Sequence, residues 1–255
     1  MIRKLYRRLL PDETRYWLYK LRNQHAFDEL RTVVYPSPKG DFSLRGFDRL
    51  ECIFVHVTKT AGTAVAKTLL GELPYHYTAW QYRVIYGRRT FDDYFKFAFV
   101  RNPWDRLHSA YAYLRGGGWN EDDRQWFSRN LSGIDDFNAF VLEWLEPERL
   151  RSHVHLWPQV DFLFDRRGEC LLDCLGYFES LEEDFQRVCA RLGVERELRH
   201  ENPSNKPDYR EVYSPDAIER VGHLYADDVR RFGYTFEGLA RRKSVADGRL
   251  VDAGS

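Results

Sequence analysis

The segment that most constrains this chain is an apolar run that ends in a short loop of small and polar residues. The run extends from Cys52 to Val57, and the loop that follows contains Thr, Lys, Ala and Gly. A helical pattern then begins, with Val65, Ala66, Leu69 and Leu70 on one side. Continuous apolar runs of this length are typical of strands buried on both faces of a parallel sheet. The segment therefore predicts an α/β domain, which a chain of 255 residues is long enough to form.

The loop after this strand has the chemistry of an anion site. Backbone N–H groups are free at the start of a helix, and phosphate is the anion that they usually bind. Lys59 adds a positive charge, and Thr60 and Thr63 add hydroxyl groups. Lys59 comes before Gly62, whereas in a Walker A loop the lysine follows the second glycine. An ATP or GTP site of the common kind is therefore disfavoured, and an ordinary tight turn between strand and helix is the alternative.

A second strand and helix follow the same plan near residue 100. The sequence KFAFVR over residues 96–101 predicts a buried strand, and Asn102 followed by Pro103 is a typical helix start. Arg101 stands at the carboxyl end of this strand, where open α/β sheets bind ligands. At about 100° per residue, Ser109 falls opposite the apolar face of the helix, so we expect its hydroxyl to stay outside the core. A structural ion pair is the alternative role for Arg101.

The rest of the chain has weaker signals. Residues 171–178 predict a third strand, Ser180 and Ser214 begin two further helices, and Gly233 ends the last one. Residues 115–134 contain three consecutive glycines and predict a long mobile loop. We expect three parts along the chain, namely a basic helical N-terminal extension packed on the core (residues 1–49), a main domain (50–238) and a flexible tail (239–255).

Composition excludes some classes of function. Lys plus Arg and Asp plus Glu both number 39, so the formal net charge is zero and no bulk attraction to nucleic acid is implied. The four cysteines lack CxxC spacing and partner histidines, which indicates free thiols in a reducing, cytoplasmic compartment. No window approaches the roughly 18 apolar residues of a membrane span, and no signal-peptide pattern opens the chain. Residues 1–22 are basic and amphipathic, which suits either peripheral membrane contact or a helix packed on the domain.

Taken together, these motifs resemble those of the carbohydrate-type, family 2 sulfotransferases, which move a sulfuryl group from 3′-phosphoadenosine 5′-phosphosulfate (PAPS). The sequence HVTKTAGTA resembles the family's 5′-phosphosulfate loop, and FVRNPWDRLHSAY resembles its 3′-phosphate motif. Two positions depart from the family pattern: Thr58, where proline is usual, and Ala64, where a hydroxyl residue is frequent. The likeness covers residues 50–237 and continues through HLWPQVDFL (155–163), GYFESLEEDF (176–185), ENPSNKPDYREVY (201–213) and YADDVRRFGY (225–234).

The resemblance implies a P-loop-like parallel β-sheet flanked by helices, the sulfotransferase fold, and it assigns roles to residues. Arg101 and Ser109 are implied to hold the 3′-phosphate of PAPS. The 5′-phosphosulfate is implied to lie in a cradle formed by Lys59, Thr60, Ala61, Gly62, Thr63 and Ala64. A sulfonate carries less charge than a terminal phosphate, and such transfers depend on positioning and electrostatics. We therefore expect Lys59 to supply the compensating charge, and we expect no metal.

The acceptor hydroxyl needs a base, and histidine is the usual one near neutral pH. His56, His76, His108 and His155 lie near the motifs. His76 occupies the place where the related enzymes carry their proposed base, so we predict His76 and Lys59 as the catalytic residues. His155 is the competing base.

The sequence thus predicts a PAPS-dependent sulfotransferase that acts on a hydroxyl acceptor, with a glycan favoured. One alternative is a nucleotide-dependent kinase with an atypical phosphate loop, which a magnesium requirement would reveal. Another is a non-catalytic module that binds a nucleotide or a glycan without turnover. The identity of the acceptor and the oligomeric state stay open.

Overall fold

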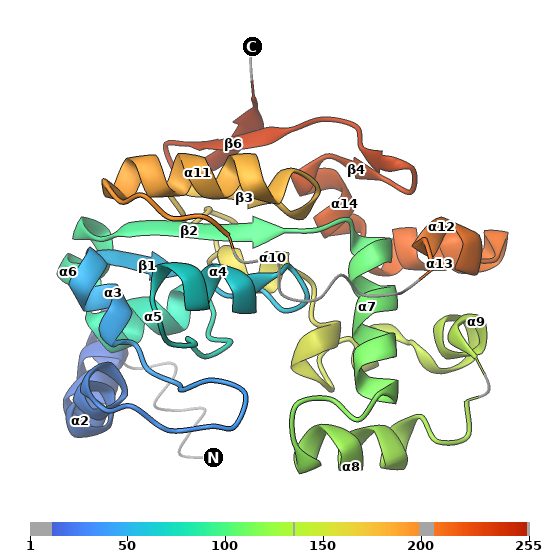
Figure 1. Ribbon diagram of the computed structural model, residues 1–255, viewed down its shortest axis with the longest axis horizontal. Helices are drawn as coiled ribbons and strands as arrows, with labels where there is room; N and C mark the ends of the chain where they lie inside the picture. Colours follow the sequence, from blue (N-terminus) through green and yellow to red (C-terminus); the bar gives the residue numbers. More distant parts are fainter. Residues whose placement is uncertain (1–11, 135, 199–206, 254–255) are drawn as a thin grey trace.

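Three parallel strands form the centre of the protein, and helices pack around them (Figure 1). The computed structural model describes residues 12–134, 136–198 and 207–253. The strand order is β1 (Cys52–Phe54), β2 (Phe95–Val100) and β3 (Cys174–Tyr177). In the parallel register Cys52 pairs with Phe95, and Val100 pairs with Tyr177. The sheet and its flanking helices confirm the α/β class that the sequence predicted.

The strands are buried on both faces because their side chains are almost all apolar. All of β1 and the last four residues of β2 have no exposed surface. The rings of Phe54 and Phe97 stack across the two strands, with their centroids 5.0 Å apart. Helix α11 (Leu181–Leu192) packs on β2 and β3, and α3 (Arg45–Leu50) packs on β1. This burial of apolar area holds the carboxyl ends of β1 and β2 side by side.

The first half of the chain supplies the helices beside β1. They are α2 (Asp12–Thr32), α3, α4 (Gly62–Leu69), α5 (Ala79–Tyr86) and α6 (Arg88–Asp93). Leu44 and Phe47, inside the expected N-terminal extension, belong to the same core as the strands. The first eleven residues of the expected helical extension lie outside the described residues, and they make up half of the segment proposed to contact a membrane. Within the described ranges, no helix has both the length and the apolar character needed to cross a membrane.

A second hydrophobic core surrounds α7 (Pro103–Arg115), which follows β2. The expectation of a mobile loop over residues 115–134 was wrong, because α8 occupies half of this range. Asn120 caps α8, and acidic residues fill its first turn, both of which favour a helix N-terminus. The elements here are α8 (Glu121–Asn130), α9 (Phe137–Ala139), the π-helical η1 (Phe140–Trp144), η2 (Pro147–Arg149), η3 (Val154–Leu156) and α10 (Val160–Leu163).

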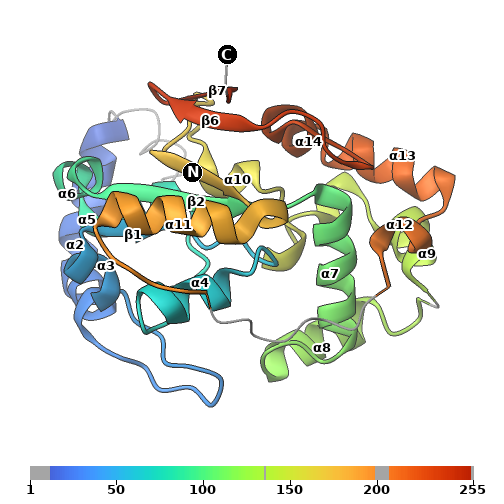
Figure 2. The same ribbon diagram turned by 45° about the horizontal axis from the view of Figure 1, so that its top comes forward.

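The C-terminal region folds back over the sheet. Its elements are η4 (Phe178–Ser180), α11, α12 (Tyr209–Val212), α13 (Pro215–Leu224), α14 (Ala226–Phe232), β4 (Tyr234–Thr235), β5 (Gly238–Leu239), β6 (Lys243–Ala246) and β7 (Arg249–Asp252). The tail expected to be flexible forms a β6–β7 hairpin instead (Figure 2). The backbone N–H of Lys243 donates to the hydroxyl of Tyr177 at 2.8 Å, and Arg242 pairs with the buried carboxylate of Asp184. These contacts attach the hairpin to β3 and α11.

Candidate active site

The loop between β1 and α4 has the backbone of an anion-binding nest. Lys59 and Ala61 adopt left-handed conformations, with φ of 66° and 61°. Left-handed residues that alternate with ordinary ones turn successive N–H groups toward one point, where an anion binds. Thr63 and Ala64 are half-buried in the first turn of α4, whose N–H groups face the same end of the helix. This loop therefore brings together most of the residues that were expected to bind the 5′-phosphosulfate.

Two threonines brace this loop from within. The hydroxyl of Thr60, expected as a ligand donor, is fully buried and donates to the carbonyl oxygen of Val57 at 2.9 Å. Its backbone N–H is the group left for an anion. The hydroxyl of Thr58 accepts from Nη1 of the buried Arg106 at 3.2 Å, and the same guanidinium donates to the carbonyl oxygens of residues 155 and 157. The residue that departs from the family pattern thus ties the phosphate loop to the segment that carries His155.

The close packing of the His56 ring leaves room only for glycine at position 62. A Cβ at Gly62 would lie 2.0 Å from Cδ2 and 2.1 Å from Nε2 of the His56 imidazole, much closer than any real contact. The His56 ring is buried and stacks on Phe54, with centroids 5.4 Å apart. Burial lowers the pKa of His56 well below its ordinary value, and the neighbouring His76 lowers it further. His56 is therefore a neutral ring that shapes the loop, as a core histidine would.

Lys59 and Arg101 bring the two expected phosphate motifs into contact. Nη1 of Arg101 donates to the carbonyl oxygen of Lys59 at 3.1 Å, across 42 residues of sequence. The Lys59 ammonium lies 4.1 Å from the centroid of the Tyr113 ring in α7. Both cations therefore stand at the carboxyl ends of adjacent parallel strands, as the sequence predicted.

Arg101 also forms the ion pair that was its alternative role. Its Nε donates to Asp105 Oδ2 at 2.7 Å, and its guanidinium stacks on Phe178 at 3.9 Å from the ring centroid. A cavity of about 540 Å³ opens beside it, with Tyr209 and Arg210 among its lining residues. The guanidinium is thus held rigidly at the wall of a cavity that contains a second cation.

Ser109 differs from its expected environment. It lies one helical turn beyond Asp105 on the same side of α7, but it is only 6% exposed. The helical period identified one apolar face, whereas in the structure nearly the whole of α7 is covered. Among the described residues, the guanidinium of Arg101 donates to Asp105 and Lys59 rather than to Ser109, and its backbone pairs with the side chain of Gln159. A shared phosphate between Arg101 and Ser109 therefore stays a prediction.

The half-buried His76 has a defined tautomer. Its Nδ1 lies 3.0 Å from the carbonyl oxygen of His56. Because a carbonyl oxygen only accepts, Nδ1 must carry the hydrogen, and Nε2 keeps its lone pair. Burial lowers the pKa of His76, which keeps the ring neutral near pH 7, and Lys59 contributes in the same direction. This is the protonation state that a general base requires.

The other two histidine candidates have different surroundings. His155 is buried, with its ring 5.8 Å from His76 and 4.7 Å from Tyr113 between centroids. Burial lowers the pKa of His155 well below its ordinary value, and His76 and His153 add to this effect. His108 packs on Phe137 in the second core. His155 therefore remains near the site as a candidate base, whereas His108 lies in the packing of the core.

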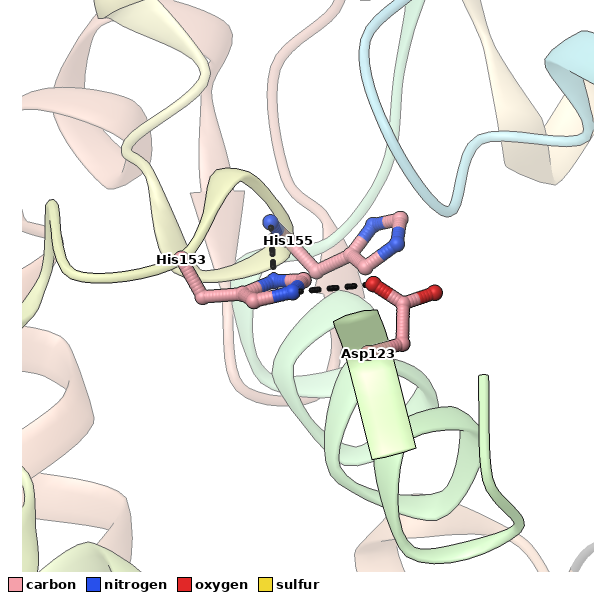
Figure 3. Close-up of side chains that lie close together, drawn as sticks. All are labelled: Asp123, His153 and His155. Atoms are coloured by element: carbon pink, nitrogen blue, oxygen red, sulfur yellow. Dashed lines mark hydrogen bonds and ion pairs between the residues drawn. The ribbon is translucent and has the colours of Figure 1, made fainter. Parts of the chain in front are cut away.

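Asp123, His153 and His155 form a cluster with the residue types of a metal site (Figure 3). The backbone N–H of His155 donates to Nδ1 of His153 at 3.3 Å. The hydrogen of the His153 ring is therefore on Nε2, which donates to Asp123 Oδ1 at 3.1 Å. Both ring nitrogens of His153 are used in this way, so the cluster suits a hydrogen-bonded network better than a metal ion. The expectation that no metal is needed stays a prediction.

Several residues of this site were not found from the sequence. Asp123 and His153 lie in segments without a recognisable pattern, and Asp123 fell in the range expected to be a loop. Tyr113 was not singled out, because it lies two residues beyond the second motif. Arg106 lies within the second motif, and this position was the signal that could have identified it.

Comparison with known proteins places the chain in a family. Residues 76–235 match the family described as the Sulfotransferase family. The chain belongs to the sulfotransferase family. The matched range includes His76, Arg101 and His155, and it starts after the loop that contains Lys59. The resemblance predicted from the two phosphate motifs is thereby confirmed.

The individual proteins that match this chain share fewer than a third of their aligned residues with it. The chain is 29% identical to carbohydrate sulfotransferase 14 of Danio rerio over 150 residues, which are 52% of this chain and 37% of that protein. It is also 29% identical over 135 residues to an uncharacterized protein of Archaeoglobus fulgidus, covering 52% of this chain and 98% of that one. A solved sulfotransferase from Alicyclobacillus acidocaldarius aligns at 21% identity with a TM-score of 0.31, over 62% of this chain and 61% of the other. The match thus spans little more than a third of the Danio rerio protein.

Proposed function

We propose that this sulfotransferase uses PAPS as its donor and transfers the sulfuryl group to a hydroxyl of a carbohydrate. The observation that supports this most is the contact between the two anion-binding motifs, with Arg101 Nη1 3.1 Å from the carbonyl oxygen of Lys59. PAPS carries anionic groups at both ends of its ribose, and two adjacent cationic sites suit such a donor. ATP has no 3′-phosphate to engage the second site.

Lys59 and the loop would bind the 5′-phosphosulfate, and Arg101 would bind the 3′-phosphate. The cavity beside Arg101 gives the adenosine part room, and Arg210 on its wall adds positive charge. Ser109, one turn beyond Asp105, is proposed to complete the 3′-phosphate site. Thr60, Ala61, Gly62 and Thr63 are proposed to contribute chiefly backbone N–H groups. The N–H of Ala64 already donates to the carbonyl oxygen of Ala61 at 3.0 Å, so Ala64 is proposed only to line the cradle.

In the proposed reaction, the acceptor oxygen attacks sulfur in line with the bond that breaks. Nε2 of His76 takes the hydroxyl proton as the new S–O bond forms. The bond between sulfur and the bridging oxygen of PAPS breaks, and its electron pair stays on the departing 5′-phosphate. Lys59 neutralises the charge that grows on that phosphate, so the chain supplies electrostatic stabilisation where a kinase uses magnesium.

A carbohydrate acceptor is proposed on narrower grounds. The Danio rerio relative is named a carbohydrate sulfotransferase, and the matched region is 29% identical to it.

We also propose a reducing, cytoplasmic environment, because the cysteines are free and three of the four are buried. Membrane contact through residues 1–22 stays a proposal.

The test is an acceptor screen with the full chain and PAPS that carries radioactive sulfur. Neutral glycans, uronate-containing glycans and phenols serve as acceptors, and Lys59→Ala serves as the matched control. We expect label on a glycan with the parent protein and loss of label in the variant. Phosphoryl transfer from ATP with magnesium would instead support the kinase alternative. Nucleotide binding without any labelled product would support the non-catalytic module.

A further inference from the structure

The ring of Tyr113 lies between the phosphate loop and the histidines. The Lys59 ammonium is 4.1 Å from its centroid, a distance at which the negative face of an aromatic ring attracts a cation. The imidazole of His155 meets the same ring nearly edge-on, at 4.7 Å and 75°. Tyr113 belongs to α7, two turns beyond Asp105, and so is carried by a rigid element. The ring can therefore define where the Lys59 side chain rests.

Asp123 holds this ring in place through its carboxylate. Oδ2 accepts from the hydroxyl of Tyr113 at 3.0 Å and from the backbone N–H of Trp119 at 2.7 Å. Oδ1 accepts from His153 at 3.1 Å. Burial tends to raise the pKa of Asp123, but the bonds from His153, Trp119 and Tyr113 outweigh it and lower the pKa. The carboxylate is therefore ionised and fully engaged.

The turn between α7 and α8 is built around this carboxylate. A Cβ at Gly118, where φ is +65°, would lie 2.2 Å from Cβ of Asp123. Glycine is needed there both for the close approach and for the left-handed backbone. On the outer side, Lys39 donates to the carbonyl oxygens of Gly118 and Trp119, at 3.2 and 2.9 Å. The close approach of Gly118 and the bonds from Lys39 to the same turn thus both fix the position of Asp123.

We propose that Tyr113 and Asp123 are positioning residues for Lys59, and that the ring, made more electron-rich by its bond to the carboxylate, holds the ammonium where the sulfuryl donor will lie. Lysine has a flexible stem of four carbons, and placing its ammonium against the departing phosphate in the transition state would otherwise cost its rotamer freedom. A ring that already restrains the ammonium reduces this cost and improves catalysis by orientation. The role in turnover rests on the proposed function, whereas the hold on Lys59 does not.

The first experiment measures the hold on Lys59 without any turnover. Tyr113→Phe is followed by phenylalanines with one, two and three ring fluorines at the same position, which keep the shape while they weaken the negative face. Acylation of Lys59 by trace acetic anhydride is followed by peptide mass spectrometry, because only the uncharged amine reacts. Lys39, whose ammonium lies 5.0 Å from the Trp119 ring, is the internal control.

We expect labelling of Lys59 to rise with each fluorine, by about threefold or more over the series, while labelling of Lys39 stays constant. A role in packing alone predicts no dependence on fluorine number. Constant labelling of Lys59 across the series would overturn the proposal.

The second experiment concerns turnover. Asp123→Asn keeps the size of the side chain but removes its charge, so we expect kcat to fall about tenfold while affinity for the desulfated product changes by less than about twofold. The fluorine series should lower kcat in the same order as it raises labelling. An unchanged kcat in Asp123→Asn together with flat labelling overturns the proposal. Fluorine-dependent labelling in a protein that sulfates no acceptor would uphold the positioning unit and reject the proposed function.

Discussion

Nδ1 of His76 lies 3.0 Å from the carbonyl oxygen of His56, two residues beyond the end of β1. This single hydrogen bond fixes the tautomer of His76 and attaches its ring to the strand that leads into the phosphate loop. Nε2 is left as the basic nitrogen, and the low pKa keeps it unprotonated near pH 7. The segment from His56 to Lys59 therefore connects the candidate base, His76, to the cation of the phosphate loop.

The first prediction concerns this base. His76→Ala should lower kcat by about a hundredfold or more, because a base acts in the transition state, while donor affinity stays near that of the parent protein. Single-turnover kinetics and titration with the desulfated nucleotide measure the two quantities separately. His155→Ala is the control, since the centroid of the His155 ring lies 5.8 Å from that of His76. If His155→Ala shows the larger pure rate defect, the base is His155.

The second prediction concerns the donor. Adenosine 3′,5′-bisphosphate differs from AMP only by the 3′-phosphate, which Arg101 is proposed to bind. At about a hundred times its Kd a ligand stabilises the folded state by about 2.7 kcal/mol, so the bisphosphate should raise Tm by several degrees. AMP and ATP should raise it far less. Equal shifts with all three nucleotides would show that no 3′-phosphate site exists.

The third prediction concerns Gly62. Gly62→Ala places a methyl group against the His56 ring, and such overpacking commonly costs about 1–3 kcal/mol. Denaturant unfolding should show this loss, and donor affinity should fall because the loop must move. His56→Ala combined with Gly62→Ala should recover part of the affinity. Gly133→Ala is the matched control, since a Cβ there meets nothing within 4 Å.

The fourth prediction concerns metal. Both ring nitrogens of His153 are engaged in hydrogen bonds, so the Asp123 cluster offers a metal ion few free ligands. We therefore expect a chelator of divalent ions to leave turnover essentially unchanged. Loss of activity in chelator, with recovery on addition of magnesium, favours the kinase alternative. Recovery with zinc alone points to the cluster of Figure 3 as a metal site.

Local patterns in the sequence predicted the two strand–loop–helix units and the cations at their ends, because each pattern depends on neighbouring residues. The positions of Asp123 and His153 could not be predicted, since only tertiary folding brings them to Tyr113 and His155. Ser109 was expected outside the core because helical periodicity shows one apolar face and cannot show that another core covers the rest.

The C-terminal residues were expected to be flexible because the segment is rich in charged residues. Polar partners on distant elements hold the hairpin, and Val245 and Leu250 also pack against the main core. Tyr177 bonds to Lys243, and the buried Asp184 pairs with Arg242. Composition identifies segments that cannot form a core, but it does not reveal polar anchors of this kind.

The last prediction is the pH dependence of stability. Burial is the largest cause that lowers the pKa of His56, His76 and His155, so the folded state binds fewer protons than the unfolded chain below about pH 6.5. Their stabilising contribution is complete above that pH and is lost as the pH falls. Asp228 acts in the opposite direction, because burial raises its pKa to about 6 and its contribution therefore grows as the pH falls through that value.

Because these effects oppose each other, the test compares variants rather than reading the profile of the parent protein. His155→Gln removes one depressed histidine, so its free energy of unfolding should fall less steeply between about pH 7.5 and about pH 5.5, by up to about 1.4 kcal/mol per pH unit. His25→Gln, at an exposed histidine of α2, is the matched control and should keep the steeper profile. Urea unfolding at several pH values gives both slopes. Parallel profiles for the parent and His155→Gln would mean that His155 is protonated equally in the folded and unfolded states, contrary to its burial in the structure.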